Sequence, residues 1–308
     1  MSGRGVAVAL LGPLEVRRDD VQIRLTAGRL RTLLATLAIS AGDTVPVERL
    51  ALALWGEELP LNARRGVQTY VARLRRALGR DVIRTLSDGY LLDVDPDRID
   101  VLRFRRLLAE AGRAPGTLAE RALVEEALAL WRGAPFEGVD SDWLCASASA
   151  YLQEARLGAV ERRIDLDMAE GRHGELVAEL KELSGRHPLR EPLWERLLVA
   201  LDRSGRQAEA LACYERLRRL LAEELGTAPS ADLRRVHASL LREEPPPNYR
   251  SPTGVRQPHA RVAVFTGRAA DLTQADREPP ARRRSASGGA TTAGMLRSSM
   301  RRQATRCG

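Results

Sequence analysis

Two periodicities of apolar residues divide the first 97 residues into predicted strands and helices. Between Val6 and Leu25 apolar and polar residues alternate, with turn signals at Gly12-Pro13 and Asp19-Asp20. A period of two residues is typical of half-buried strands, because successive side chains point to opposite faces of a sheet. This segment therefore predicts three short antiparallel strands.

Three helices are predicted next, because apolar residues recur at intervals of three and four positions. These residues are Leu30, Leu33, Leu34, Leu37 and Ala38 in the first helix, Leu50, Leu54 and Trp55 in the second, and Val67, Val71, Leu74 and Leu78 in the third. Thr26 is expected to cap the first helix, and Pro46 to begin the second, which ends at Gly56. Asn62 is expected to cap the third, which ends at Gly79.

A β-hairpin is predicted to close this part of the chain. Residues 82–86 and 90–94 have the composition of strands, and Ser87-Asp88-Gly89 lies between them as a turn. Strands, three helices and a closing hairpin within residues 1–97 predict a winged helix-turn-helix domain that binds duplex DNA.

The third predicted helix carries the residues that suit DNA. It is rich in arginine and nearly free of acidic residues. With its valines and leucines on one side, the residues expected on or beside the opposite side are Arg65, Gln68, Thr69, Ala72, Arg73 and Arg76. A guanidinium can donate two hydrogen bonds to guanine, and a glutamine amide can pair with adenine. We predict base contacts by Arg65, Gln68, Thr69 and Arg73, and phosphate contacts by the surrounding arginines, including Arg64 and Arg76.

A solvated basic face on an ordinary helix is the alternative interpretation. It would be favoured for an isolated arginine-rich helix. Here a second helix precedes and a hairpin follows directly, which is the order of elements in a DNA-binding winged helix and favours DNA binding.

A family resemblance extends this interpretation. Residues 30–79, which end in NARRGVQTYVARLRRALG, and residues 83–94, which read IRTLSDGYLLDV, resemble the amino-terminal part of the Streptomyces antibiotic regulatory protein family. That part is similar to the DNA-binding domain of response regulators. Residues 98–244 resemble the bacterial transcriptional activator domain of the same family.

The resemblance implies roles for single residues. It implies base-edge contacts by Arg65, Thr69 and Arg73, phosphate contacts by Tyr70 and Arg75, and a DNA-backbone contact by Thr85. Response-regulator wings often present a basic residue to the minor groove, whereas this turn reads Ser87-Asp88-Gly89. Arg84 is the nearest substitute and is predicted to contact phosphate.

Residues 98–244 are predicted to form an all-α domain. Helices are expected near 143–171, 174–184, 191–204, 206–225 and 230–242, after a break at 133–136. The segments that begin GRHGEL at Gly171 and GRQAEA at Gly205 are offset by one tetratricopeptide period. This predicts tetratricopeptide-like helix pairs that present a surface to partners; a generic helical bundle with coincidental spacing is the alternative.

Charge and composition narrow the function classes. The chain has a formal net charge of +8, but the excess lies in residues 245–308, an arginine-rich segment that we expect to be a disordered tail. The body is close to neutral, so the case for DNA rests on the third helix alone. Cys145 and Cys213 are expected in the core, and the three widely separated cysteines form no zinc or disulfide pattern. No apolar run could span a membrane, and a cytoplasmic, nucleoid-associated protein is expected.

The sequence therefore predicts a mainly α protein with a small α+β part: a winged helix (1–97), a helical activator domain (98–244) and a tail. No catalytic grouping, metal site or cofactor motif is apparent, and no enzyme is predicted. By resemblance, the expected function is activation of a specialised-metabolite gene cluster, with a homodimer on direct repeats in double-stranded promoter DNA and contact with RNA polymerase holoenzyme. A repressor on the same fold and a peptide-sensing interaction module remain open.

Overall fold

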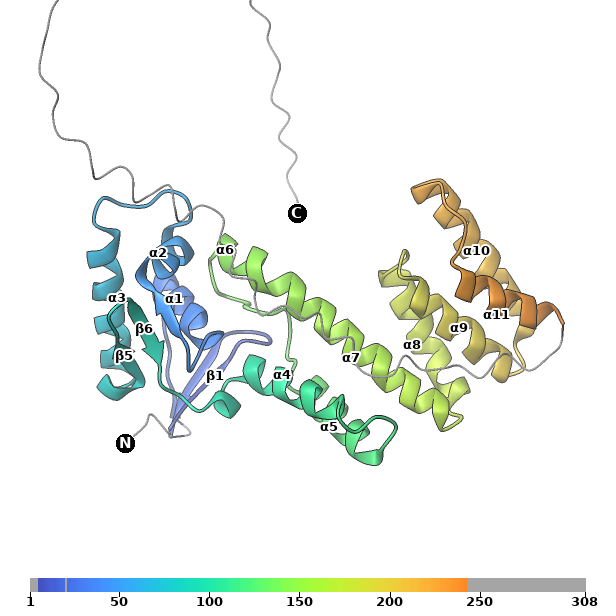
Figure 1. Ribbon diagram of the computed structural model, residues 1–308, viewed down its shortest axis with the longest axis horizontal. Helices are drawn as coiled ribbons and strands as arrows, with labels where there is room; N and C mark the ends of the chain where they lie inside the picture. Colours follow the sequence, from blue (N-terminus) through green and yellow to red (C-terminus); the bar gives the residue numbers. More distant parts are fainter. Residues whose placement is uncertain (1–4, 20, 243–308) are drawn as a thin grey trace, which may run out of the picture. The chain divides into compact units, whose positions relative to one another are not determined.

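The structure is a computed structural model that describes residues 5–19 and 21–242 (Figure 1). Its amino-terminal part contains two small sheets and three helices. The elements are β1 (Val6–Ala9), β2 (Glu15–Arg18), β3 (Val21–Gln22), α1 (Gly28–Ala38), β4 (Thr44–Pro46), α2 (Val47–Trp55), α3 (Ala63–Leu78), η1 (Arg80–Val82), β5 (Ile83–Thr85) and β6 (Gly89–Leu92). This order confirms the predicted winged helix.

The first sheet is an antiparallel meander in the order β1-β2-β3. Val8 pairs with Val16, and both are buried, while Ala7 pairs with the exposed Arg17. The alternation seen in the sequence therefore separates a core face from an outer face, as it does in half-buried sheets.

The second sheet has the order β4-β6-β5, with both pairs antiparallel. β5 and β6 are the predicted hairpin. The sequence did not indicate β4, because a three-residue strand has little pattern of its own and exists through its pairing with β6. Gly89 sits at that pairing, where an added Cβ would lie 2.0 Å from the carbonyl oxygen of Val45.

The predicted apolar stripes of the three helices face the core. Val67, Val71, Leu74 and Leu78 of α3 are all buried, as are Leu33, Leu34, Leu37 and Ala38 of α1. Leu50 and Leu54 of α2 are also buried, whereas Trp55 is half-buried.

Three details of the helix ends differ from expectation. Residue 27, not Thr26, lies at the N-cap of α1, and no side chain caps that helix. Pro46 is the last residue of β4, so α2 begins one residue later. Asn62 precedes α3 as expected, but its side chain makes no capping hydrogen bond, and Gly79 ends the helix with φ at 111°. The residue types therefore indicated where the helices begin and end, but they did not determine whether a side chain makes a capping hydrogen bond.

The ordered elements of the remaining described residues are all helices, which confirms the predicted all-α part. Its elements are η2 (Pro96–Arg98), α4 (Asp100–Ala111), α5 (Leu118–Ala129), α6 (Asp142–Leu144), a π turn (Cys145–Ser149), α7 (Ala150–Ala169), α8 (His173–Arg186), α9 (Glu191–Arg203), α10 (Gln207–Leu225) and α11 (Ala231–Leu241). Cys145 is exposed in the π turn, so its expected burial was wrong; Cys213 is buried.

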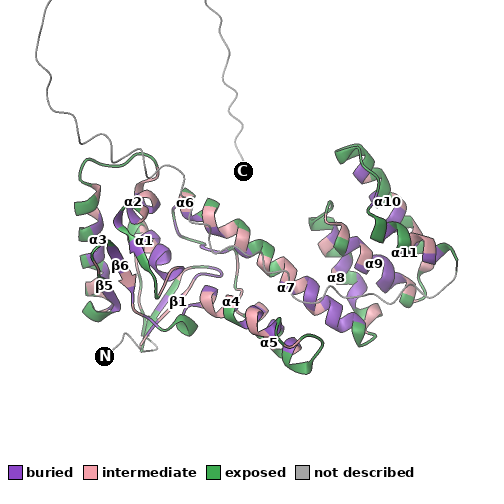
Figure 2. Ribbon diagram, in the orientation of Figure 1, coloured by how far each residue is buried: buried purple, intermediate pink, exposed green. Residues whose placement is uncertain are grey.

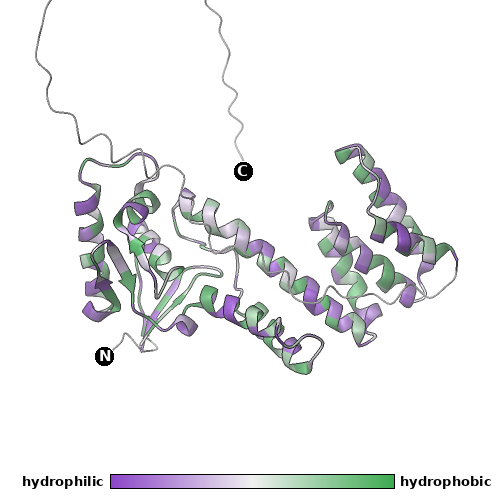
Figure 3. Cartoon of the chain, in the orientation of Figure 1, coloured by the Kyte–Doolittle hydropathy of each residue, from purple (hydrophilic) through white to green (hydrophobic). Residues whose placement is uncertain are grey.

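The repeat found in the sequence corresponds to a repeated structural unit. Gly171 and Gly205 occupy equivalent turns after α7 and α9, with φ at 81° and 71°. This left-handed conformation favours glycine. α9 packs against α8, α10 and α11, and Figure 3 shows the hydrophobic positions of α8 and α9. The arrangement matches tetratricopeptide-like helix pairs.

Two apolar cores stabilise the described chain. The first is a single cluster of buried side chains drawn from between Val6 and Ala159, and the second is drawn from between Ile164 and Leu240. The first core therefore crosses residue 97, so the winged helix shares its interior with α4, α5 and the first half of α7.

Asp100 strengthens this junction. Its carboxylate accepts hydrogen bonds from the backbone N–H groups of Leu10, Leu11 and Val101 at 2.7–2.9 Å. Burial raises the pKa of this carboxyl above its ordinary value, although the three hydrogen bonds oppose the shift. The first residue of α4 therefore holds the end of β1.

Buried ion pairs join the segments around the second half of α7. Arg162 forms a bidentate pair with Glu120 of α5, and Arg196 of α9 forms one with Asp165. All four side chains are almost fully enclosed, so their charges depend on each other for compensation.

Candidate nucleic-acid interface

The outer face of α3 is the candidate site. All four predicted base-contact residues, Arg65, Gln68, Thr69 and Arg73, are exposed on this helix. Figure 2 shows exposed positions along α3 on the side away from α1 and α2. The helix spacing that buries its valines and leucines therefore projects these four side chains outward together.

The guanidinium groups of this face have no acidic partners. Among the residues that the structure describes, no acidic side chain forms a salt bridge with Arg64, Arg65, Arg73, Arg76 or Arg84, all of which are exposed. An unpaired exposed guanidinium can donate to phosphate without first breaking an internal ion pair. The local surface is therefore positive even though the body of the chain is nearly neutral.

Arg75 differs from its neighbours. Its Nε donates to the carbonyl oxygen of Ile83 at 2.9 Å, and Nη2 donates to Oγ1 of Thr85 at 2.7 Å. The guanidinium also lies over the ring of Tyr90, 5.9 Å from its centroid. Arg75 thus connects the hairpin to α3. This role is not evident in the sequence, because both acceptors become neighbours of Arg75 only in the folded chain.

Thr85 is exposed on the hairpin, and its hydroxyl oxygen accepts the bond from Arg75. The structure thus brings together Arg75 and Thr85, two of the three residues for which the resemblance implies contacts with the DNA backbone. Arg84 precedes Thr85 on β5, and its side chain faces solvent.

Tyr70, in the middle of α3, belongs to a cluster of aromatic and cationic side chains. Its hydroxyl accepts a hydrogen bond from Arg29 of α1 at 3.3 Å, and its ring lies 6.2 Å from that of Trp55. Arg29 in turn lies over Trp55, and Arg73 over Tyr70, each at 5.7 Å. Sequence reasoning missed Arg29 as a site residue, since it lies in another helix.

Gly66 permits this arrangement. A Cβ on Gly66 would lie 2.8 Å from the indole of Trp55, so only glycine allows α3 to approach Trp55 this closely. A shallow hollow of about 400 Å³ opens beside it, and its lining includes Arg65, Thr69 and Arg73. Three of the four predicted base-contact side chains therefore line a concave part of the surface, and Gln68 lies outside it.

The same described residues contain no group of three or more His, Cys, Asp or Glu side chains that could hold a metal ion. Within residues 5–19 and 21–242, no helix has the length and hydrophobicity needed to cross a bilayer.

Comparison with known proteins assigns both parts of the chain to families. Residues 20–92 match the family described as "Transcriptional regulatory protein, C terminal", and residues 99–241 match the "Bacterial transcriptional activator domain". Regulatory protein DnrI of Streptomyces peucetius is 40% identical over 252 residues, which cover 77% of this chain and 93% of DnrI.

The chain belongs to the Streptomyces antibiotic regulatory protein family. Transcriptional regulator RedD of Streptomyces coelicolor is 36% identical to this regulator over 253 residues, covering 79% of this chain and 72% of RedD. The solved structure of Mycobacterium tuberculosis EmbR in complex with a low-affinity phosphopeptide is 32% identical, with a TM-score of 0.74, and the match covers 79% of this chain and 66% of that one. The regulator thus combines a winged helix with a bacterial transcriptional activator domain.

Proposed function

We propose that this regulator binds duplex promoter DNA through the outer face of α3 and activates a specialised-metabolite gene cluster. One observation carries the proposal: α3 buries its whole apolar stripe and exposes a face of unpaired arginines interspersed with Gln68, Thr69 and Ala72. Small and amide side chains between guanidinium groups suit close approach to base edges in the major groove.

The residues divide into two classes of contact. Arg65, Gln68, Thr69 and Arg73 line the exposed centre of α3 and are proposed to read base edges. Arg64, Arg76, Arg84, Tyr70, Thr85 and Arg75 surround them and are proposed to contact phosphate. Phosphate contacts fix the position of a protein on the duplex, and base contacts supply sequence preference.

Activation requires a contact beyond DNA. We propose that the regulator is cytoplasmic, binds direct repeats as a homodimer, and in this state contacts RNA polymerase holoenzyme. The loop between α2 and α3 offers an apolar surface for it. Leu61 is fully exposed, and Leu59 is also exposed. Exposed large apolar side chains close together are candidates for protein contacts. Leu61→Ser should therefore reduce promoter activation while leaving DNA affinity unchanged.

The decisive experiment is genome-wide mapping of bound DNA in the native host, followed by titration of the full chain on the recovered site. Arg73→Ala should weaken binding to that site by about 1–3 kcal/mol and relax preference at one base pair. Arg76→Ala should weaken all sequences alike and reduce the salt slope by about 0.9. Arg113→Ala is the matched control, because Arg113 is an exposed arginine in the helical part.

A footprint that shows no protected promoter DNA at physiological salt would contradict DNA binding. Equal reductions in affinity for Arg73→Ala and Arg113→Ala would contradict the assignment of α3 as the reading helix. Bound sites that lie inside unrelated genes would contradict the proposed role in a gene cluster.

A further inference from the structure

A second hollow, of about 280 Å³, lies beside the first sheet and away from α3. Its floor is the outer face of β1 and β2. Burial alternates along β1, so that Val6 and Val8 point into the core while Ala7 and Ala9 face outward. Because alanine projects only a methyl group, the floor stays low and the hollow stays open.

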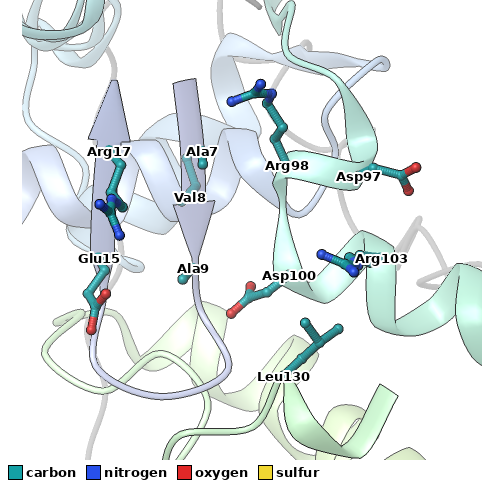
Figure 4. A pocket seen from close by; sticks show the side chains of 10 residues that line it. All are labelled: Ala7, Val8, Ala9, Glu15, Arg17, Asp97, Arg98, Asp100, Arg103 and Leu130. Atoms are coloured by element: carbon teal, nitrogen blue, oxygen red, sulfur yellow. The ribbon is translucent and has the colours of Figure 1, made fainter. Parts of the chain in front are cut away.

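The walls come from a different part of the chain. The lining residues outside the two strands are Asp97 and Arg98 of η2, Asp100 and Arg103 of α4, and Leu130. Figure 4 shows Asp100 and Arg103 directed toward the strands of the floor, whereas Asp97 points away from them. The hollow therefore joins the sheet of the winged helix to the start of the helical activator domain.

The acidic side chains of the hollow are already occupied. Glu15 binds Arg132 and Asp97 binds Arg106, each with a nitrogen–oxygen distance of 2.6 Å. Asp100 is held by its three backbone N–H donors. These carboxylates have little capacity left to attract a cation or to neutralise an arginine in the hollow.

Arg98, unlike these carboxylates, has no partner for its side chain among the described residues. Within the described part of the chain its guanidinium makes no hydrogen bond, ion pair or ring contact. Nη2 of Arg103, the neighbouring arginine, donates a hydrogen bond to Glu126 at 2.6 Å. The other N–H groups of this guanidinium can still donate. The lining thus has unused donors, occupied acceptors, and apolar surface from Ala7, Ala9 and Leu130.

We propose that this hollow binds a small organic anion. Its carboxylate or phosphate oxygens would accept hydrogen bonds from Arg98, and its short apolar portion would cover the two alanines and Leu130. A planar guanidinium fits both oxyanions with paired hydrogen bonds. Such a ligand contacts β1 and α4 together and strengthens the junction that Asp100 holds. The proposal is independent of DNA binding.

The test uses the full chain without DNA, with benzoate and phenyl phosphate as probes and benzamide as an uncharged analogue of benzoate. Calorimetric titration at constant ionic strength should give saturable binding for at least one anionic probe and none for benzamide. The preferred probe identifies the oxyanion. Arg98→Gln should weaken binding by about tenfold, the usual effect of removing a charged hydrogen-bond donor. Arg113→Gln, with the same charge change outside the hollow, should bind like the native chain.

Ala9→Val provides a second test, because valine suits a strand and its added methyl groups occupy the floor. This variant should fold, by circular dichroism, and fail to bind the probe. Binding that persists in both Arg98→Gln and Ala9→Val would overturn the proposal, as would equal binding of benzamide and benzoate. Absence of saturable binding by both anions would overturn it too.

Discussion

Replacing Arg75 tests whether this arginine positions the hairpin. Arg75→Ala removes the hydrogen bonds to Ile83 and Thr85 and the stacking on Tyr90. Hydrogen bonds from a charged donor contribute about 1.5–3 kcal/mol each. Because the guanidinium is half-buried and water can replace part of these interactions, we expect the two bonds together to contribute about 1–2 kcal/mol. For a unit of this size the Tm should fall by about 2–8 °C.

The assay is thermal unfolding of the full chain, compared with two matched variants. Arg76→Ala removes the same charge from the next position of α3, where the side chain is exposed, and should change stability by less than about 0.5 kcal/mol. Thr85→Val removes one acceptor and keeps the charge of Arg75, so it should lie between the two.

DNA titration then separates positioning from phosphate binding. Arg75→Lys keeps the positive charge but loses the planar guanidinium that makes both hydrogen bonds. If Arg75 acts through the hairpin, this variant should be less stable than the native chain, and the salt dependence of its DNA affinity should be nearly unchanged. If Arg75 also binds a phosphate, Arg75→Ala should lower that slope by about 0.9. Equal melting temperatures for Arg75→Ala and Arg76→Ala would refute the positioning role.

Three further variants test the packing that supports the site. Gly89→Ala should destabilise the second sheet by about 1–3 kcal/mol, since its Cβ would overlap the carbonyl of Val45; a native urea midpoint would contradict this. Arg162→Met leaves Glu120 buried without compensation and should cost about 3–5 kcal/mol in urea unfolding, with recovery when both are replaced by Met; no recovery would contradict the pairing. Because burial holds the pKa of Asp100 above its ordinary value in the folded chain, the contribution of Asp100 to stability should decline as pH rises through the interval between the unfolded and folded pKa values. Urea unfolding of the native chain and of Asp100→Asn should show that slope as a pH-dependent difference in stability.

The apolar periodicity of α3 determined most of the site. Once Val67, Val71, Leu74 and Leu78 must face a core, helix geometry alone places Arg65, Gln68, Thr69 and Arg73 on the other side. The same reasoning located the hairpin, and the repeat identified the turns at Gly171 and Gly205. Each of these features depends on residues that are close in sequence.

What the sequence could not supply depends on residues that are far apart in it. The sequence shows that Arg75 is basic, but not that it donates a hydrogen bond to Ile83. Nor does it show that Arg29 donates a hydrogen bond to Tyr70. The pattern suggested a boundary at residue 97, whereas packing continues across it, with the carboxylate of Asp100 holding Leu10 and Leu11.

The type and spacing of side chains determine secondary structure, because they set the backbone dihedral preferences and the match to the helix or strand period. Contacts such as Asp100 with Leu10 depend on where two distant segments meet. Many positions along a chain could satisfy the same carboxylate or guanidinium, and only the complete packing of the core selects one of them.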